Sequence, residues 1–334
     1  MIEMMDKIDF VIPWVDGSDV AWQQQRNFYA GNHEKISDAQ YRDWGVLKYW
    51  FRSVERYAPW VNKIHLVTCD QIPDWLNTDH PQLNCVNHTD YIPEKYLPTF
   101  NSNVIELNFH RIPDLAEHFV YFNDDMYINA PVTPKDFFVK GSPCETPILS
   151  ILSSPVPGDA FAHLLLNDIC VINKYFKKRE VVASAKKKWF YWGYGKYLLK
   201  NLYYSYLKAF SAFHNFHVAS SMRKSTFEEV WKHETELLEN TCKNKFRGLN
   251  DVNQYVMSYY NICKGEFVPR KANTGKFYVI GQETQKLYED IRKGKHKLIC
   301  INDDPDDLQD IEKHREGLIS VFEQKYPEKS TFEK

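Results

Sequence analysis

Residues 118–125 of the chain read HFVYFNDD, and this stretch decides the fold class. Its run of four apolar residues predicts a strand that is buried on both faces, because a half-exposed strand would alternate apolar and polar side chains. The strand is followed at once by Asn123, Asp124 and Asp125. Since open α/β sheets bind ligands at the carboxyl ends of their strands, these residues are well placed for metal or nucleotide chemistry. The alternative is a solvated turn without a ligand.

Other segments complete the pattern of an α/β protein. Residues 44–57, WGVLKYWFRSVERY, carry apolar residues at helical spacing until Ala58-Pro59 ends the pattern. Strand, helix and strand in this order predict a right-handed crossover and a parallel sheet. The further strands are expected at 8–15 (IDFVIPWV), 63–68 (KIHLVT) and 84–88 (NCVNH).

Acidic residues follow two further apolar segments. The first strand runs into Asp16-Gly17-Ser18-Asp19, and the segment KLICIND at 297–303 ends in Asn302-Asp303. Carboxylates from separate strand ends, brought together by the fold, bind hard divalent cations such as Mg²⁺ or Mn²⁺ that bridge substrate phosphates. The residues alone therefore predict a metal-dependent nucleotide site at one edge of the sheet.

Composition permits a soluble enzyme and excludes some other classes. Hydrophobic residues make up 43% and charged residues 26% of the 334 residues, as in ordinary globular proteins. The net charge of -2 gives no chain-wide attraction for nucleic acid. Seven cysteines without a C-x-x-C pair favour reduced thiols over disulfides or a zinc site. We expect neither a signal peptide nor a membrane span, and a cytoplasmic location with the inner face of the membrane open to peripheral contact.

Aromatic residues are in excess, at 15% of the chain, and residues 177–216 are both aromatic and rich in lysine. Two interpretations of this stretch stay open. It is either an amphipathic insertion that docks on a membrane surface or an acceptor glycan, or a packed helical subdomain. Further along, Asn250 is expected to cap a helix that carries Val252 and Tyr255 on one face.

Four segments, in chain order, carry a resemblance to a known family. They are IDFVIPWVDGSD at 8–19, YRDWGVLKYWFRSVERYAPWVNKIHLVT with the LPTFNSNVIELNFHRIPDLAEHFVYFNDDMY stretch at 97–127, KSTFEEVW with KFRGLNDVNQYV, and LICINDDPDD to EQKYPEKSTFE. In this order they resemble the four conserved regions of the Stealth family of polysaccharide phosphotransferases. The second similarity is about ninety residues of near-continuous match, and the four together cover well over half of the chain.

The resemblance implies a fold and an activity. The family has a nucleotide-sugar-binding α/β core like that of GT-A glycosyltransferases and is similar to the catalytic part of the lysosomal-enzyme N-acetylglucosamine-1-phosphotransferase. It implies attack by a hydroxyl of an acceptor glycan on the sugar-linked phosphorus of a UDP-sugar, with release of UMP, in capsular or exopolysaccharide synthesis. The chain then divides into a nucleotide-sugar-binding segment at 1–140, a lid and aromatic helical insertion at 141–216, and a return to the core at 217–334.

Metal and nucleotide ligands follow from the matched motifs. The resemblance implies that Asp125 and Asp303 hold the metal, with Asp124 as the alternate ligand, and that Asn123 contacts the nucleotide. Asp16 and Asp19 match a region near the nucleotide, although Asp19 has the alternative role of a local turn stabiliser.

Catalytic residues are also carried over. Gln71 and Glu106 lie at motif positions that the family places in the active site, and the alternative for Glu106 is an exposed carboxylate on a helix. Arg52, on the helix at 44–57, is a candidate for phosphate contact; its alternative is a solvated helix face.

His217 is the preferred general base, because a histidine with a pKa near neutrality suits removal of an acceptor proton. The family carries an H-x-P motif here, whereas this chain reads HVA from position 217, which leaves His214 as a competitor. Arg247 is expected to stabilise charge on the transferred phosphoryl group, and the alternative is an ion pair with Asp251.

Two other functions remain open on the sequence alone. One is a glycosyltransferase that attacks the anomeric carbon and releases UDP, and the other is a non-catalytic glycan-binding protein with the aromatic stretch as its surface. The sequence also leaves open the identity of the sugar and of the acceptor, and the oligomeric state. It does not tell whether the enzyme polymerises repeating units or adds a single phosphate-linked sugar.

Overall fold

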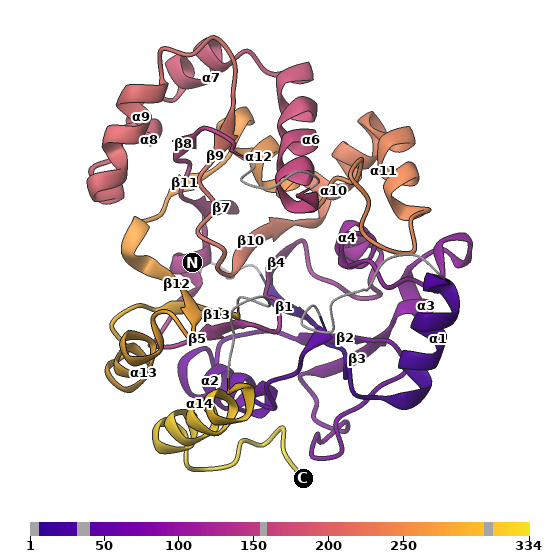
Figure 1. Ribbon diagram of the computed structural model, residues 1–334. Helices are drawn as coiled ribbons and strands as arrows, with labels where there is room; N and C mark the ends of the chain where they lie inside the picture. Colours follow the sequence, from indigo (N-terminus) through magenta and orange to yellow (C-terminus); the bar gives the residue numbers. More distant parts are fainter. Residues whose placement is uncertain (1–6, 32–40, 154–158, 304–309) are drawn as a thin grey trace, which may run out of the picture.

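The structure, a computed structural model, describes residues 7–31, 41–153, 159–303 and 310–334. Its main sheet has five strands in the order β10-β4-β1-β2-β3, drawn across the middle of Figure 1. The first four strands in chain order are parallel, and β10 joins β4 antiparallel. The α/β class and the mainly parallel sheet are therefore confirmed. The bounds are β1 Ile8–Pro13, β2 Ile64–Thr68, β3 Leu83–Asn87, β4 His118–Tyr121 and β10 Ser220–Arg223.

Side chains of the central strands alternate between two hydrophobic clusters, one on each face of the sheet. In β4, Val120 packs into one cluster, whereas Phe119 and Tyr121 pack into the other. The crossover helix α2 (Leu47–Tyr57) covers the first face and buries Trp50 completely. This two-sided burial explains the unbroken apolar run of the strand.

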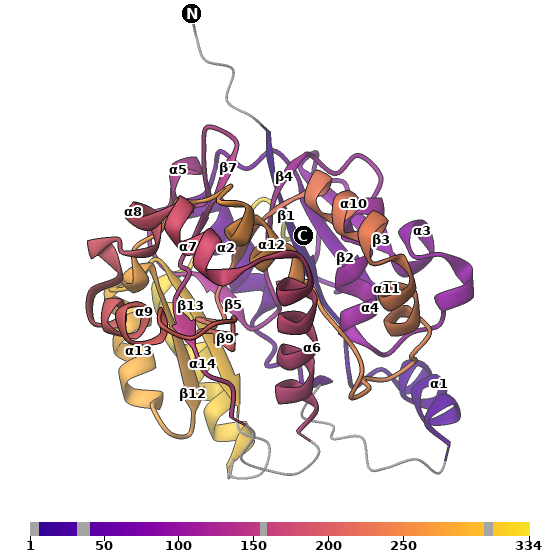
Figure 2. The same ribbon diagram turned by 90° about the horizontal axis from the view of Figure 1, so that it is seen from above.

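A second sheet lies beside the first. It contains β12 (Gly275–Ile280), β13 (Leu298–Asp303) and β5 (Met126–Ile128), with β13 in the middle. The strand expected at 297–303 is thus confirmed, but it runs antiparallel to β5 and belongs to this smaller sheet. Figures 1 and 2 show the sheet, with α13 (Thr284–Lys293), on the opposite side of the molecule from α1 (Val20–Ala30).

Helices of the later sequence cover the second face of the main sheet. There α6 (Ala160–Tyr175) packs against α12 (Tyr255–Lys264), and α12 packs on α10 (Lys224–His233). No helix within the described ranges is both long and apolar enough to cross a membrane. The remaining helices are α3 His88–Tyr91, α4 Ser102–Leu107, α5 Pro134–Phe137, α7 Lys178–Ser184, α8 Lys186–Trp189, α9 Leu198–Tyr204, α11 Thr235–Cys242, α14 Ile311–Lys325 and the 3₁₀ turns η2 Glu94–Tyr96, η3 Phe109–Arg111, η4 Trp192–Tyr197 and η5 Ala272–Thr274. The short strands are β6 Phe138–Val139, β7 Ser142–Glu145, β8 Leu149–Ser150, β9 Ala212–Phe213 and β11 Val268–Pro269.

The helix expected to start after Asn250 begins five residues later, at Tyr255. The cause is the buried carboxylate of Asp251, which accepts hydrogen bonds from Asn101, Asn103 and Asn244 and from the backbone N–H of Gly248. These bonds hold Asp251 in a loop, so the prediction of a cap at Asn250 was wrong.

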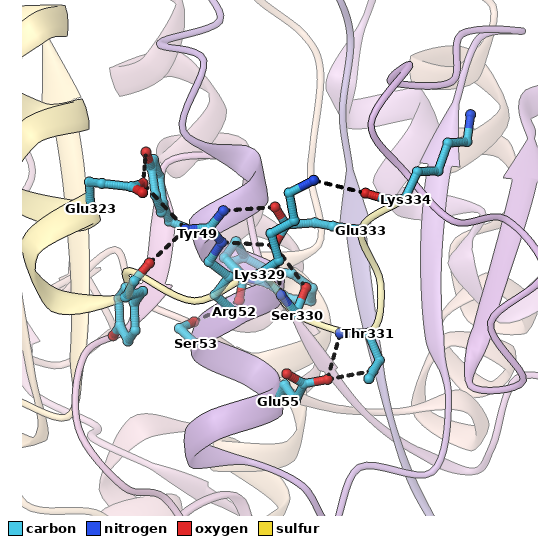
Figure 3. A network of polar contacts seen from close by, with 12 residues as sticks. Tyr49, Arg52, Ser53, Glu55, Glu323, Lys329, Ser330, Thr331, Glu333 and Lys334 are labelled. Carbon is cyan, nitrogen blue, oxygen red and sulfur yellow. Dashed lines mark hydrogen bonds and ion pairs between the residues drawn. The ribbon is translucent and has the colours of Figure 1, made fainter.

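Arg52 is a structural residue, which corrects the prediction of a phosphate contact. Its buried guanidinium donates to both carboxylate oxygens of Glu333 at 2.8 Å and to the carbonyl oxygen of Tyr326 at 2.6 Å (Figure 3). Glu323 accepts a further bond at 3.3 Å. Since every donor group faces the C-terminal segment, Arg52 ties that segment to α2 and does not line the cavity described below.

We predict that Arg52→Leu lowers the free energy of unfolding by about 3–5 kcal/mol, because it removes the cationic partner of the buried carboxylate of Glu333. The double variant Arg52→Leu/Glu333→Leu should recover most of this loss. Urea unfolding of the two variants, the single Glu333→Leu variant and the wild type measures the coupling. A loss of less than about 1 kcal/mol in Arg52→Leu would contradict a buried, energetically coupled pair.

Candidate active site

A cavity of about 1830 Å³ opens where β1 and β4 end. This is the carboxyl edge of the parallel strands, where open α/β sheets bind their ligands. The structure brings seven of the candidate residues to the wall of this cavity: Glu106, Asn123, Asp124, Asp125, His214, His217 and Arg247.

Asp124 and Asp125 lie in the tight turn that joins β4 to β5. The backbone N–H of Met126 donates to the carbonyl oxygen of Asn123 at 3.0 Å and closes the turn. On its far side, the N–H of Ile301 in β13 donates to the carbonyl oxygen of Asp125 at 2.8 Å. The backbone that carries the two carboxylates is therefore fixed by hydrogen bonds at both ends of the turn.

The electrostatics of this turn fit a divalent cation. Asp124 is exposed to the cavity, yet loss of hydration at the cavity wall and, next, the charge of Asp125 raise its pKa to about 7. The Oδ1 atom of Asp125 is buried and finds no hydrogen-bond partner among the described residues. An unpaired buried carboxylate oxygen is costly unless a cation or donor satisfies it. Asp125 and Asp124 thus suit a hard cation with oxygen ligands.

Two other side chains approach Asp125. Cys300 in β13 donates its thiol to Oδ2 at 3.2 Å, and the Nε2 atom of His217 lies 3.5 Å from the same oxygen. The three form the cluster of potential metal ligands found in the described chain. Burial raises the pKa of Cys300 well above its ordinary value, so its sulfur is a neutral thiol and a poor ligand.

Asp303 is placed only by its backbone. It ends β13 opposite Ile280, and its side chain lies outside the described part of the structure. Its assignment as a metal ligand therefore stays a prediction.

His217 is oriented by two partners. Its Nδ1 lies 3.0 Å from the hydroxyl of Tyr255 in α12, and its Nε2 faces Asp125. Burial opposes the charged ring, but the hydrogen bond and negative charge of Asp125 outweigh that effect and raise the pKa of His217. The backbone at His217 is left-handed, with φ 45°, and its N–H donates to Asn215 at 2.7 Å.

His214 lines the same cavity in a different environment. Its ring stacks on Tyr197 with centroids 4.9 Å apart and meets the edge of Phe216 at 4.7 Å. Burial and the nearby charges of Lys200 and Lys196 lower its pKa to about 4. His214 is consequently a neutral ring with no carboxylate partner in the part of the chain that the structure describes, which makes it the weaker candidate for a general base.

Glu106 is a buried carboxyl, so the alternative of an exposed helical side chain is excluded. It accepts a hydrogen bond from the hydroxyl of Tyr121 at 2.9 Å. Burial raises its pKa to about 7, while the charge of Arg247 acts in the opposite direction. The Tyr121 hydroxyl also contacts Asn123, which links Glu106 to the end of β4.

Arg247 lies exposed at the cavity wall and donates to the hydroxyl of Ser102 at 2.8 Å, at the start of α4. Within the described residues it makes no ion pair with Asp251, whose carboxylate is occupied by asparagine side chains. The guanidinium is therefore available to a ligand in the cavity.

The acidic loop after β1 has a different role from the expected one. Gln71 clamps Asp16 through both ends of its amide, accepting from the Asp16 N–H at 2.9 Å and donating to the Asp16 carbonyl at 3.1 Å. Asp19 caps α1 by accepting from the N–H of Trp22 at 2.6 Å, which is the local role left open by the sequence. Asp16 itself accepts from Ser18.

None of the three loop residues lines the cavity. Gln71 uses its amide to position the loop, and its assignment as a catalytic residue stays a prediction. The proposal that Asp16 and Asp19 contact a nucleotide finds no support in their side-chain contacts.

Sequence reasoning missed three residues of the site: Tyr121, Tyr255 and Cys300. Each sits inside an apolar strand or helix pattern. The one available signal was a polar atom on an otherwise apolar face, since a buried tyrosine hydroxyl needs a hydrogen-bond partner.

Comparisons with known proteins give a consistent result. Conserved region 1 of the Stealth proteins matches residues 6–34, and conserved region 2 matches residues 40–145. A capsular polysaccharide phosphotransferase WcwK of Streptococcus pneumoniae is 41% identical over 99% of both chains. The exopolysaccharide phosphotransferase cps2G of Lactiplantibacillus plantarum is 40% identical over 98% of this chain and 96% of its own. A crystal structure of galactosyltransferase LgtC with donor and acceptor sugar analogs covers 93% of this chain and 95% of its own, at 10% identity and a TM-score of 0.38.

We predict that Asp125→Asn lowers the pKa of His217, because it removes the charge that raises it. Imidazole NMR titration in the absence of divalent cations measures this pKa, with His217→Gln used to assign the resonance. Glu106→Gln should lower it less, since Glu106 acts only through its more distant charge. An unchanged His217 pKa in Asp125→Asn would show that the two side chains do not interact in solution.

The raised pKa of Glu106 makes the stability of the protein depend on pH. Its folded pKa of about 7 exceeds the model-peptide value of 4.5, so the stability present below pH 4.5 is lost as the pH rises through 7. For this group alone the loss approaches about 3 kcal/mol. Glu106→Gln should therefore gain stability relative to the wild type at about pH 8 compared with about pH 5, as measured by urea unfolding. The exposed Glu236→Gln on α11 is the control, and an equal effect of Glu106→Gln at both pH values would refute the prediction.

Proposed function

The chain belongs to the Stealth family of polysaccharide phosphotransferases, and we propose that it transfers a sugar 1-phosphate from a UDP-sugar to a hydroxyl of an acceptor glycan, releasing UMP, in capsular or exopolysaccharide synthesis. The observation that carries this proposal is the convergence of a carboxylate pair, a histidine and an arginine on one cavity at the strand ends. Those groups match the needs of phosphoryl transfer, namely charge neutralisation and removal of a proton.

The size of the cavity supports two substrates. At about 1830 Å³ it exceeds the range of roughly 300–1000 Å³ that is usual for the pocket of one small ligand. Its wall also changes character, from the aromatic residues Trp14, Trp22 and Tyr41 to the polar groups around Asp125. A nucleotide-sugar and the end of a glycan would fit together in this volume.

Asp125 and Asp124 would hold Mg²⁺ or Mn²⁺, because they combine an unpaired buried carboxylate oxygen with a second carboxyl in the same turn. When bound, such a cation supplies charge neutralisation for the phosphate oxygens of the donor. Asn123 is adjacent to both carboxylates, and its amide N–H would donate to the same phosphate oxygens.

His217 is the proposed general base. Its Nδ1 is held by Tyr255, which leaves Nε2 to face the ligand side next to Asp125. The Nε2 atom would take the proton of the acceptor hydroxyl as the oxygen attacks the sugar-linked phosphorus. The bond from that phosphorus to the bridging oxygen breaks, UMP leaves with the bonding electrons, and a phosphodiester forms.

Arg247 and Glu106 have supporting roles in this proposal. The exposed guanidinium of Arg247 would donate to oxygens of the phosphoryl group, where bidentate contacts are strongest. Glu106, with a pKa of about 7, binds the Tyr121 hydroxyl at the cavity wall and would accept a hydrogen bond from the acceptor.

The released nucleotide tests the reaction directly. Purified protein, a panel of UDP-sugars, an acceptor polysaccharide and Mg²⁺ or Mn²⁺ should yield UMP with at least one donor, and chelation by EDTA should abolish its release. Release of UDP, or of no nucleotide with every donor, would overturn sugar-phosphate transfer.

Within this assay, His217→Gln should lower kcat by about 10²–10⁴-fold with donor binding retained, since that is the usual contribution of a positioned acid–base group. His214→Gln is the matched control, because it alters a histidine of the same cavity that lacks a carboxylate partner. Unchanged turnover in His217→Gln would remove that residue from the mechanism.

A further inference from the structure

The α9 region presents apolar side chains to solvent. Leu199, Leu202 and Tyr203 in α9 and Tyr206 in the following turn are spaced i, i+3, i+4 and i+7, and each is between 54% and 69% exposed. Residues at this spacing share one face of a helix. The rings of Tyr203 and Tyr206 meet edge to face at 5.7 Å, which confirms that they are neighbours. Exposed contiguous apolar surface of this kind marks an interaction site.

The opposite face of α9 is fixed by a polar side chain. Asn201 is fully buried, donates to the carbonyl oxygens of Pro147 at 3.0 Å and Trp189 at 2.7 Å, and accepts from the N–H of Leu149 at 2.6 Å. An ordinary surface helix buries its apolar face and exposes its polar one. In α9 the buried residue is the polar Asn201, whereas Leu199, Leu202 and Tyr203 face solvent. The hydrogen bonds of Asn201 fix this orientation of the helix.

The surroundings of this face are basic. Residues 181–227 contain no aspartate or glutamate, whereas the exposed lysines include Lys196 and Lys208. Neither lysine forms an ion pair with a carboxylate in the described residues; the ammonium group of Lys196 lies over the ring of Tyr197, 5.5 Å from its centroid. The local positive charge is therefore free to attract an anionic partner.

We propose that the α9 surface, defined as Leu199, Leu202, Tyr203, Tyr206, Lys196 and Lys208, binds the surface of an anionic lipid bilayer. The leucines and tyrosines would enter the boundary between headgroups and acyl chains, and the lysines would pair with lipid phosphates. The lysines would attract either lipid phosphates or the phosphodiesters of a glycan, but only a bilayer offers an apolar layer for the leucines, and this favours the bilayer. Figure 1 shows α8 and α9 together at one corner of the molecule, away from the main sheet.

The α9 surface adjoins the candidate active site. All six residues of η4, which precedes α9, line the cavity, and Trp192 among them is 87% exposed. A bilayer bound at the α9 surface would therefore lie beside one wall of the cavity. The proposal goes beyond the proposed reaction, and lipid binding does not depend on it.

Vesicle sedimentation tests the proposal with the full chain. Binding to phosphatidylcholine vesicles that contain roughly one third phosphatidylglycerol should be at least about tenfold stronger than to pure phosphatidylcholine, and high salt should weaken it. Leu199→Gln/Leu202→Gln/Tyr203→Gln should reduce binding about tenfold or more, because burial of these side chains drives insertion. Lys196→Gln/Lys208→Gln should reduce the preference for anionic vesicles while the apolar face stays intact.

Val20→Gln/Phe28→Gln is the matched control, since it removes equally exposed apolar side chains from α1. Circular dichroism and thermal midpoints establish that each variant is folded, and UMP release with a soluble acceptor is measured in parallel, so that a failed reaction is distinguished from failed lipid binding. Absence of wild-type binding, or equal binding by the α9 and α1 variants, would overturn the proposal. Normal vesicle binding with weakened affinity for soluble polysaccharide would identify a glycan surface instead.

Discussion

The turn between β4 and β5 is the constraint on which the site depends, because it is hydrogen-bonded to both sheets. Before the turn, the N–H of Phe122 donates to the carbonyl oxygen of Val11 in β1 at 2.9 Å. Within it, the N–H of Ile301 in β13 reaches Asp125 at 2.8 Å. The chain thus leaves the five-stranded sheet and enters the three-stranded sheet within a few residues, and its carboxylates lie at the junction of the two.

Local sequence pattern predicted the main features of this arrangement. The apolar runs at 8–15, 63–68, 84–88 and 118–124 are strands, the pattern at 44–57 is the crossover helix, and the sheet is mainly parallel. Asp124, Asp125, His217 and Glu106 share the cavity as the resemblance implied. Strands and their ends are predictable because the spacing of apolar residues is a local property of the sequence. The order of the parallel strands follows from general rules for the connections between them.

The errors come from contacts between residues that are distant in sequence. The helical pattern left Arg52 without a partner, whereas in the structure Glu333 of the C-terminal segment binds its guanidinium. The bonds between Gln71 and the backbone of Asp16 were likewise not predicted. Asp251 likewise interrupts a helix through asparagines from another element. Cys300 reaches Asp125 because β13 joins the smaller sheet, a pairing that no local pattern encodes. Side-chain partners of this kind depend on tertiary packing, which overrides propensity.

Attachment of the turn to two sheets also has a consequence for how the site is lost when the protein unfolds. The two hydrophobic clusters pack on opposite faces of the main sheet, and proteins open in partly independent cooperative units. The buried residues of β13 belong to the same cluster as α2 and one face of the main sheet. Opening of that cluster would release Asp125 and Cys300 together, so the geometry of the site depends on the cooperative unit that contains β13.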